Sequence, residues 1–304
     1  MTTTAAARPG GRFTAGKLHA VLEDVCSGLG LDHRGARLIK FTSNAVFHLA
    51  HDPVVVRIVG SVGLRHRASK VVDVARWLEE HDVPAVRLLP GVRQPVVAGD
   101  HLVTVWSAVP ATGRALTGRD LGRVLRRLHE LPAPTFALPR WAPLDDVRRR
   151  LADAEELADD DRAFLEERCA DLAVRLASLR PVLPTGVLHG DAHLGNLIPS
   201  PRGPVLCDFD SVSLGPREWD LTVLPVGVAR FGHAAHLNRQ LVRSYRFDVT
   251  RWDGFGVLRA VRELKLTTAV LPILRSNPVV RSELRRRLDA LRRGDTRSRW
   301  TPYR

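Results

Sequence analysis

The sequence predicts an α+β protein that has a small antiparallel sheet in its first third and a larger, mostly helical part after it. Short strand-like runs rich in β-branched residues and separated by turn signals occur at residues 36–59 and 85–106. From Arg119 onward, the apolar residues recur at helical spacing instead. Residues 107–118 contain one proline and two glycines, which favours a hinge or linker. We therefore expect two lobes, formed by residues 15–106 and 119–304.

The first lobe shows alternating strand-like and helix-like patterns. Val71, Val74 and Leu78 lie at helical spacing, so their segment can cover one face of a meander of short strands. Gly99-Asp100 is a hairpin turn signal between two strand-like runs. The expected helices cover residues 15–29 and 65–81, and the expected strands cover 36–41, 44–49, 53–59, 85–89, 94–98 and 101–106.

The second lobe is dominated by amphipathic helices. Its first helix carries one apolar stripe of Leu121, Val124, Leu125 and Leu128 and ends near Leu131. Charged residues are numerous in the helices that follow, and they indicate solvated faces. The further expected helices cover residues 144–157, 159–179, 219–231, 234–246, 252–274 and 278–293.

Length and composition are those of a soluble globular protein. The 304 residues are 44% hydrophobic and 26% charged, and no apolar run approaches the length that spans a bilayer. Residues 1–14 lack the apolar core of a secretion signal and indicate a disordered tail. The cysteines at positions 26, 169 and 207 lie far apart and form no metal-binding spacing. We therefore expect a cytoplasmic protein with no membrane association.

The formal net charge of +13 requires a separate explanation. A basic surface attracts any polyanion, including nucleic acid. The cations are nearly all arginines, however, and they are spread over many segments that also contain acidic residues. We therefore regard nucleic acid as an unlikely partner, and no obligate protein partner is evident. A nucleotide polyphosphate would use the same positive field with fewer contacts.

Two segments, residues 187–198 and 205–210, each begin with apolar residues and then carry a group of polar residues at a turn. A buried strand tolerates such a concentration of acceptors when a ligand or a metal ion uses them. The polar side chains concerned are those of His189, Asp191, Asn196, Asp208 and Asp210.

These residues form a recognisable pattern. The string His-Gly-Asp at 189–191 is followed by Asn196, then by Asp-Phe-Asp at 208–210 and by Gly-Pro-Arg-Glu-Trp-Asp-Leu at 215–221. The pattern resembles the aminoglycoside phosphotransferase-like (choline kinase) family of the protein-kinase-like fold, and the resemblance covers residues 36–230. It implies a two-lobed kinase fold and phosphoryl transfer to a small molecule.

The resemblance also implies roles for the motif residues. Asp191 would accept the hydrogen bond of a substrate hydroxyl and orient it toward the γ-phosphate. Asn196 and Asp208 would offer oxygen ligands to Mg²⁺. Asp210 would be either a further metal ligand or an acid that supports the ligands.

The two histidines of the catalytic string have different expected roles. His189 is expected to hold the loop through hydrogen bonds rather than to transfer protons. His193 either points at substrate or phosphate or simply covers the loop. Asp220 is expected to be a buried anchor for the loop, as the resemblance implies.

The first lobe would hold the nucleotide. Arg57 occupies the position of the phosphate-binding lysine, and its planar guanidinium suits phosphate oxygens. Small and hydroxyl residues follow the first strand, where backbone amides and hydroxyls can bind phosphate. The phosphate-binding residues expected there are Thr42 and Ser43. The adenine ring is expected beside the end of the last strand, against backbone groups of Ser107, Ala108 and Val109.

The sequence departs from the family pattern at one position. The helix over residues 65–81 should carry a glutamate that pairs with the cation at position 57, but Val71 stands there. Asp73 is a possible substitute, although its helical face differs by about 200°. The partner of Arg57 therefore stays open at the level of sequence.

The sequence thus predicts an ATP- and Mg²⁺-dependent phosphotransferase that acts on a hydroxyl of a small molecule of antibiotic, sugar or amino-alcohol type. The alternatives are an inactive nucleotide-binding pseudokinase with a regulatory or scaffold role, and a nucleic-acid-binding protein that uses the Arg-rich helix 278–293. Few acidic residues are available for a cationic substrate, the candidates being Asp220, Asp248, Asp253 and Glu263. An aromatic wall for a sugar or choline-like group has four candidates, Tyr245, Phe247, Trp252 and Phe255.

Overall fold

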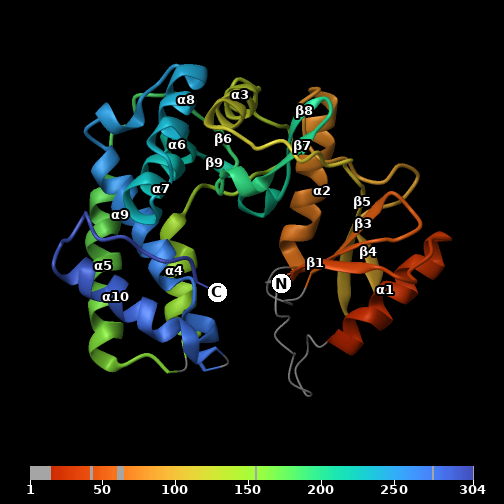
Figure 1. Cartoon of the computed structure of the whole chain (residues 1–304), viewed down its shortest axis with the longest axis horizontal. Helices are drawn as coiled ribbons and strands as arrows, with labels where there is room; N and C mark the ends of the chain where they lie inside the picture. The colour runs from red at the N-terminus through yellow and green to blue at the C-terminus, as the bar shows by residue number, and fades with distance from the viewer. Residues whose placement is uncertain (1–14, 42–43, 60–64, 155, 276, 304) are drawn as a thin grey trace. The chain divides into compact units, whose positions relative to one another are not determined.

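The computed structural model describes residues 15–41, 44–59, 65–154, 156–275 and 277–303, so the tail predicted over residues 1–14 lies outside the described part. The chain forms two compact units (Figure 1). Unit 1 contains residues up to Ala115 together with Leu197–Asp210, and unit 2 contains Leu116–Asn196 together with Ser211–Arg304.

Unit 1 is built on a five-stranded antiparallel sheet with the strand order β1-β2-β3-β5-β4. The strands are those expected from the alternating apolar runs, apart from one. Their bounds are β1 Arg37–Phe41, β2 Asn44–His48, β3 Val54–Val59, β4 Val96–Ala98 and β5 His101–Ser107.

Strand β3 shows how the pattern of side chains positions Arg57. Val54, Val56 and Ile58 are buried in the core of unit 1. Successive side chains of a strand point to opposite faces, so Arg57 projects from the other face of the sheet. The apolar alternation of this strand therefore fixes the direction of its cation.

Two helices belong to unit 1, α1 (Ala15–Leu29) and α2 (Arg65–Glu80), as the sequence predicts. Helix α1 contacts β3 and β4 and buries Leu18, Leu22 and Val25 in the same core as the sheet. Helix α2 contacts β5, and its apolar residues Val71, Val74 and Leu78 are buried as expected.

The strand predicted over residues 85–89 is wrong. Ala85 and Leu88 form only isolated bridges, to Leu206 and Trp106 respectively. The backbone of this segment divides its hydrogen bonds, because Val86 donates to Leu206 O at 2.9 Å while Leu89 donates to the β5 carbonyl of Val105 at 2.9 Å. A segment that pairs alternately with two neighbours cannot form a continuous ladder with either.

The hairpin of β7 (Leu197–Ser200) and β8 (Gly203–Leu206) is the part of unit 1 that comes late in the chain. In Figure 1 it is drawn in green beside the orange helix α2. The backbone N–H of Thr112 donates to Pro199 O at 2.7 Å, and the Val86–Leu206 bond adds a second link. These contacts attach the segment that carries Asp208 and Asp210 to the rest of unit 1.

Unit 2 is mostly helical. Its helices are α3 Gly118–His129, α4 Pro143–Ala152, α5 Asp159–Ala177, α6 Glu218–Leu221, α7 Val223–Phe231, α8 Ala235–Tyr245, α9 Phe255–Thr268 and α10 Arg281–Arg292. A two-stranded antiparallel ribbon pairs β6 (Thr185–Leu188) with β9 (Ser213–Pro216). The apolar stripes of α4, α5, α9 and α10 meet in one core.

Local signals explain several helix ends in unit 2. Helix α3 begins with a capping box, in which Thr117 and Asp120 satisfy each other's backbone N–H groups. The helix predicted over 252–274 is shorter than expected, because α9 ends at Thr268 and a separate 3₁₀ turn at Leu271–Ile273 contains a proline. The helix predicted over 219–231 is divided into α6 and α7, and that predicted over 144–157 ends at Ala152.

The described structure therefore confirms the α+β class, with an antiparallel sheet in unit 1 and a mostly helical unit 2. Among the described residues, no helix is both long and apolar enough to cross a membrane.

Candidate active site

The loop that carries the predicted catalytic residues follows β6 in unit 2. Its first turn requires a glycine, because Gly190 has φ +83° and a Cβ there would lie 2.2 Å from Ser211 O. The turn leads from the buried strand into a short 3₁₀ turn at Leu194–Asn196.

Asp220 holds this loop from α6. It is fully buried and accepts the backbone N–H groups of His189 at 2.7 Å and of Gly190 at 2.9 Å. His129 Nε2 lies 3.1 Å from the same carboxylate, and the other ring nitrogen of His129 is 2.8 Å from the Tyr245 hydroxyl. The buried anchor role expected for Asp220 agrees with this geometry.

The surroundings of Asp220 keep it ionised. Burial raises the pKa of Asp220, but the hydrogen bond and charge of His129, together with His189, outweigh burial and lower the pKa below its ordinary value. An ionised carboxylate is the stronger acceptor for two backbone N–H groups. The anchor therefore holds the turn with a full negative charge at neutral pH.

A second layer of support comes from Trp219 and Arg262. Trp219 Nε1 donates to Gly190 O at 2.8 Å. The guanidinium of Arg262 stacks on the Trp219 ring at 4.1 Å and donates to Thr222 Oγ1 at 2.6 Å. The sequence analysis did not predict Arg262 and His129, because each is one of several polar residues on an amphipathic helix and no motif surrounds it.

Asp191 lies on the exposed side of the loop. Its side chain is 54% exposed, and His193 Nε2 lies 3.6 Å from its carboxylate. Partial burial raises the pKa of Asp191, but the hydrogen bond and charge of His193, with the charges of Arg262 and His189, lower it overall. Asp191 is therefore an accessible carboxylate that stays ionised well below neutral pH.

Asn196 is oriented by the same loop. Its Nδ2 donates to Asp191 O at 2.8 Å, and its backbone N–H donates to His193 O at 2.9 Å. The side chain is nearly fully buried. Because the amide nitrogen is engaged inside the loop, the carboxamide oxygen is the group that can serve a ligand.

In unit 1, the carboxylate of Asp210 forms an ion pair with Arg57. Asn44 Nδ2 donates to the same carboxylate at 3.3 Å, and Lys70 Nζ donates to Asp210 O at 2.6 Å. The side chains of Arg57 and Asp210 are 12% and 21% exposed. The structure thus gives Arg57 an acidic partner, while Val71 is buried in the core.

Asp208 lies two positions before Asp210. Its backbone φ is +69°, a left-handed conformation that is uncommon outside glycine. Lys40 Nζ, from β1, lies 2.8 Å from its carboxylate. The carboxylate is 28% exposed. Asp208 is therefore an accessible anionic oxygen donor whose charge is balanced by a lysine.

The remaining nucleotide-binding predictions fall at the end of β5 and after β1. Ser107 N–H donates to Arg87 O at 2.9 Å and Ala108 N–H donates to Pro53 O at 2.7 Å. These two N–H groups are therefore engaged in hydrogen bonds within unit 1. An adenine ring would have to be recognised by the carbonyl groups of Ser107 and Ala108 and by the backbone of Val109. Thr42 and Ser43 lie outside the described residues.

The chemistry of the predicted metal ligands can be compared with what a hard divalent cation prefers. Within the described residues, no group of three or more His, Cys, Asp or Glu side chains could hold a metal ion by itself. Mg²⁺ does not need such a group, because it usually binds through one or two carboxylates, water and substrate phosphates. The oxygen atoms of Asn196 and Asp208 are ligands of the type that Mg²⁺ prefers.

Three of the four acids considered for a cationic substrate make structural contacts instead. Asp220 is buried in the loop anchor, and the buried Glu263 pairs with Arg230 at 2.7 Å. Asp248 accepts the backbone N–H of Thr250 at 3.1 Å. Of the four candidate acids, Asp253 is thus the one for which the described residues show no such contact.

Comparison with known proteins identifies the family. The sequence profile of the phosphotransferase enzyme family matches residues 36–255, which is well over half of the chain. The chain belongs to this family. The resemblance derived from the motif at 189–221 is thereby confirmed, and it supports a small-molecule phosphotransferase. No curated protein sequence matches the chain significantly.

Solved structures resemble the chain in fold. An amicoumacin kinase in complex with AMP-PNP, Ca²⁺ and Ami has a TM-score of 0.71 at 14% identity, covering 94% of this chain and 98% of its own. The choline kinase LicA from Streptococcus pneumoniae has a TM-score of 0.63 at 15% identity, covering 91% and 99%. A spectinomycin phosphotransferase in complex with ADP and spectinomycin has a TM-score of 0.60 at 16% identity, covering 93% and 94%. At these identities the likeness shows the fold, and the predicted kinase-like class is confirmed.

Proposed function

We propose that this chain transfers the γ-phosphate of ATP to a hydroxyl group of a small molecule in an Mg²⁺-dependent reaction. The observation that carries the proposal is Asp191, an accessible, ionised carboxylate on a loop that the buried Asp220 holds in place. A carboxylate in that state can accept the proton of a substrate hydroxyl and orient the oxygen for attack. The amicoumacin kinase, choline kinase and spectinomycin phosphotransferase that share this fold support the same reaction class.

The other residues have distinct tasks in this proposal. Asn196 and Asp208 would provide oxygen ligands for Mg²⁺, which when bound would neutralise charge on the triphosphate. Arg57 would bind phosphate oxygens, and Asp210 would hold its guanidinium in position. The metal-ligand role predicted for Asp210 stays a prediction beside this positioning role. His193 would keep Asp191 ionised, and His189 would hold the loop through its backbone.

Nucleotide contacts complete the assignment. Thr42 and Ser43 would bind phosphate through hydroxyl and amide groups, and the backbone of Ser107, Ala108 and Val109 would recognise adenine. The ion pair of Arg57 with Asp210 supplies the carboxylate that the family pattern places at Val71. That pair removes the reason for regarding the chain as an inactive pseudokinase. We expect the protein to act in the cytoplasm, where ATP and Mg²⁺ are abundant.

The charge of the candidate acidic side chains bears on which phosphate acceptor the protein uses. Amino-alcohols and aminoglycosides are cationic and favour acidic pockets, whereas this chain commits Asp220 and Glu263 to internal contacts. A hydroxyl compound of low positive charge is therefore the preferred acceptor. Sugars and weakly charged antibiotics meet this description.

The decisive experiment compares the wild type with Asp191→Asn. Both proteins are incubated with ATP, Mg²⁺ and a panel of hydroxyl compounds, and phosphorylated products are detected by mass spectrometry. We expect Asp191→Asn to lower kcat by about 10²–10⁴-fold while ATP affinity stays within about twofold. The control is Asp159→Asn, a neutralised exposed aspartate on α5 that should leave kcat unchanged. A wild type that binds ATP·Mg²⁺ but phosphorylates nothing in the panel would favour the pseudokinase alternative.

A further inference from the structure

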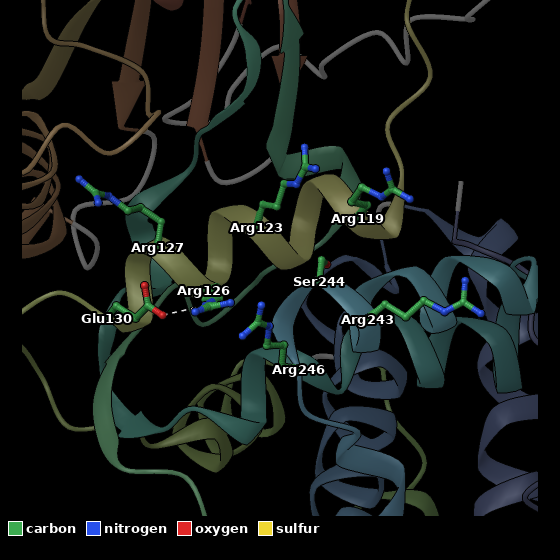
Figure 2. Close-up of a pocket in the computed structure, with 8 residues that line it drawn as sticks. All are labelled: Arg119, Arg123, Arg126, Arg127, Glu130, Arg243, Ser244 and Arg246. Atoms are coloured by element: carbon green, nitrogen blue, oxygen red, sulfur yellow. Dashed lines mark hydrogen bonds and ion pairs between the residues drawn. The ribbon is translucent and has the colours of Figure 1, made fainter.

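A basic pocket lies between α3 and α8 in unit 2, and none of its lining residues is assigned to phosphoryl transfer. Its cavity volume is about 480 Å³. Figure 2 shows the lining side chains, which are six arginines with one glutamate and one serine. They are Arg119, Arg123, Arg126, Arg127, Glu130, Arg243, Ser244 and Arg246.

The arginines are presented by regular features of the two helices. Arg119, Arg123 and Arg127 follow one another at intervals of four and therefore share one side of α3. Arg243 lies in the last turn of α8, and Arg246 is its C-cap with φ +69°. The left-handed cap turns the chain at the end of the helix and carries Arg246 to the pocket.

Two glycines of α3 allow the helices to approach closely. A Cβ on Gly118 would lie 1.8 Å from Leu237 O, and a Cβ on Gly122 would lie 2.0 Å from Ser244 Oγ. Backbone contact of this kind brings the arginines of one helix next to those of the other. Figure 2 shows Arg126 and Arg246 pointing toward one another from the two helices.

The pocket carries a strong excess of positive charge. Arg126 pairs with Glu130 at 2.7 Å. Arg119, Arg123, Arg243 and Arg246 have no carboxylate partner anywhere in the described part of the chain. Facing like charges are unfavourable unless an anion lies between them.

The contrast with α10 shows that this excess is not general to the arginines. On that helix Arg285 and Arg292 both pair with Asp161, at 3.0 and 2.6 Å, and Arg287 is buried against Glu283. The Arg-rich helix considered for nucleic acid is thus largely neutralised within the protein. The pocket between α3 and α8 differs from that helix, because it gathers four arginines that have no ion-pair partner among the described residues.

We propose that this pocket binds a small anion that carries several linked phosphate groups, of the oligophosphate class. Planar guanidinium groups bind phosphate oxygens in pairs of hydrogen bonds, and several of them around one cavity suit a multivalent anion. The volume is that of a small-molecule site rather than of a long groove. The described residues that line the pocket include no aromatic side chain on which the bases of a single-stranded nucleic acid could stack.

The test is calorimetric titration of the full chain with inorganic tripolyphosphate in the absence of divalent metal. We expect saturable binding that weakens as salt rises. The double variant Arg126→Gln/Arg246→Gln should bind about tenfold more weakly or worse. The matched control Arg202→Gln/Arg293→Gln removes two exposed arginine charges outside the pocket and should stay within about twofold of the wild type.

Three results would overturn the proposal. The first is the absence of saturable binding by the wild type, and the second is an equal loss of affinity in the control variant. The third is unchanged affinity in the Arg126/Arg246 variant, since tripolyphosphate would then be bound elsewhere, for example by residues that hold ATP. If the double variant unfolds at lower temperature than the wild type, the exposed single variant Arg123→Gln takes its place under the same criteria. Binding of a short single-stranded oligonucleotide but not of tripolyphosphate would also contradict the proposed ligand class.

Discussion

Arg57 and Asp210 lie 153 positions apart in the chain and form an ion pair within unit 1. Arg57 lies on the central strand β3, and Asp210 lies just after β8. In the family pattern, a glutamate on helix α2 pairs with this cation. Val71 stands at that position in this chain, and it is buried. The orientation of the phosphate-binding cation therefore depends on the segment that also carries Asp208.

Replacement of Asp210 by asparagine should destabilise the protein. The change leaves the guanidinium of Arg57, which is only 12% exposed, without its carboxylate. We expect the free energy of unfolding to fall by about 1–3 kcal/mol, as measured by urea denaturation. The matched control is Asp145→Asn, whose pair with Arg148 is more than half exposed on both sides and should cost less than about 1 kcal/mol. Equal losses in the two variants would contradict a special role for the Arg57 pair.

Asp220→Asn should lower the free energy of unfolding more than Asp210→Asn does. The variant weakens the acceptor for the N–H groups of His189 and Gly190 in a fully buried place, so we expect a loss of about 2–4 kcal/mol at pH 7. Asp171→Asn, at an exposed aspartate of α5, is the control and should change the unfolding free energy little.

The same variant should alter the pH dependence of stability. The folded-state pKa of Asp220 is lowered, so its ionised form stabilises the fold above the unfolded pKa of about 4. This contribution is lost as the pH falls through the folded pKa. The difference in unfolding free energy between wild type and Asp220→Asn should therefore shrink as the pH is lowered below about 4. A difference that stays constant between pH 7 and pH 3 would show that Asp220 does not act through its charge.

Gly118→Ala and Gly256→Ala should have opposite effects. The Cβ added at position 118 meets the backbone oxygen of Leu237 at 1.8 Å, and α8 would have to move, which we expect to cost about 1–3 kcal/mol. The Cβ added at position 256, in α9, meets nothing within 4 Å, and alanine should stabilise the helix by up to about 1 kcal/mol. Thermal unfolding of both variants measures the difference. Stabilisation by both substitutions would mean that α3 and α8 do not need their close contact.

Lys40→Met should increase the affinity of the free protein for a divalent cation. Lys40 neutralises Asp208, the proposed metal ligand, through a partly exposed contact of 2.8 Å. Removal of such a competing charge should strengthen Mn²⁺ binding by about two- to fivefold, measured by electron paramagnetic resonance without nucleotide. Lys17→Met removes an exposed lysine of α1 and serves as the control. Weaker Mn²⁺ binding in Lys40→Met would be evidence against competition between the lysine and the metal.

The elements of the fold follow largely from local patterns in the sequence. Period-two apolar runs locate β2, β3 and β5, and helical stripes such as Leu121, Val124 and Leu125 locate α3. The error at 85–89 has a tertiary cause, because its backbone groups bond to both β5 and the late segment around Leu206. A local pattern contains no information about such a divided environment.

The candidate site follows from the sequence only where its residues are close together in the chain. The string around Asp191 and the following Asp208 are found from motif spacing, and Asp220 is found from the segment after them. Motif spacing does not reveal that Asp210 is the partner of Arg57. The two residues are 153 positions apart, and their ion pair depends on how the hairpin β7–β8 packs. His129 contacts Asp220 from another helix, and nothing near it in sequence indicates this role.

The late entry of residues 197–210 into unit 1 also affects how the chain is synthesised. A ribosome completes the five-stranded sheet when residue 107 has been added, but the carboxylate of Asp210 is made about a hundred residues later, after several helices of unit 2. During that interval the nascent sheet carries Arg57 without its acid. An expressed fragment that stops at Ala115 would be fixed in this unfinished state, whereas a circularly permuted gene that joins 197–210 to the sheet would supply the missing charge early.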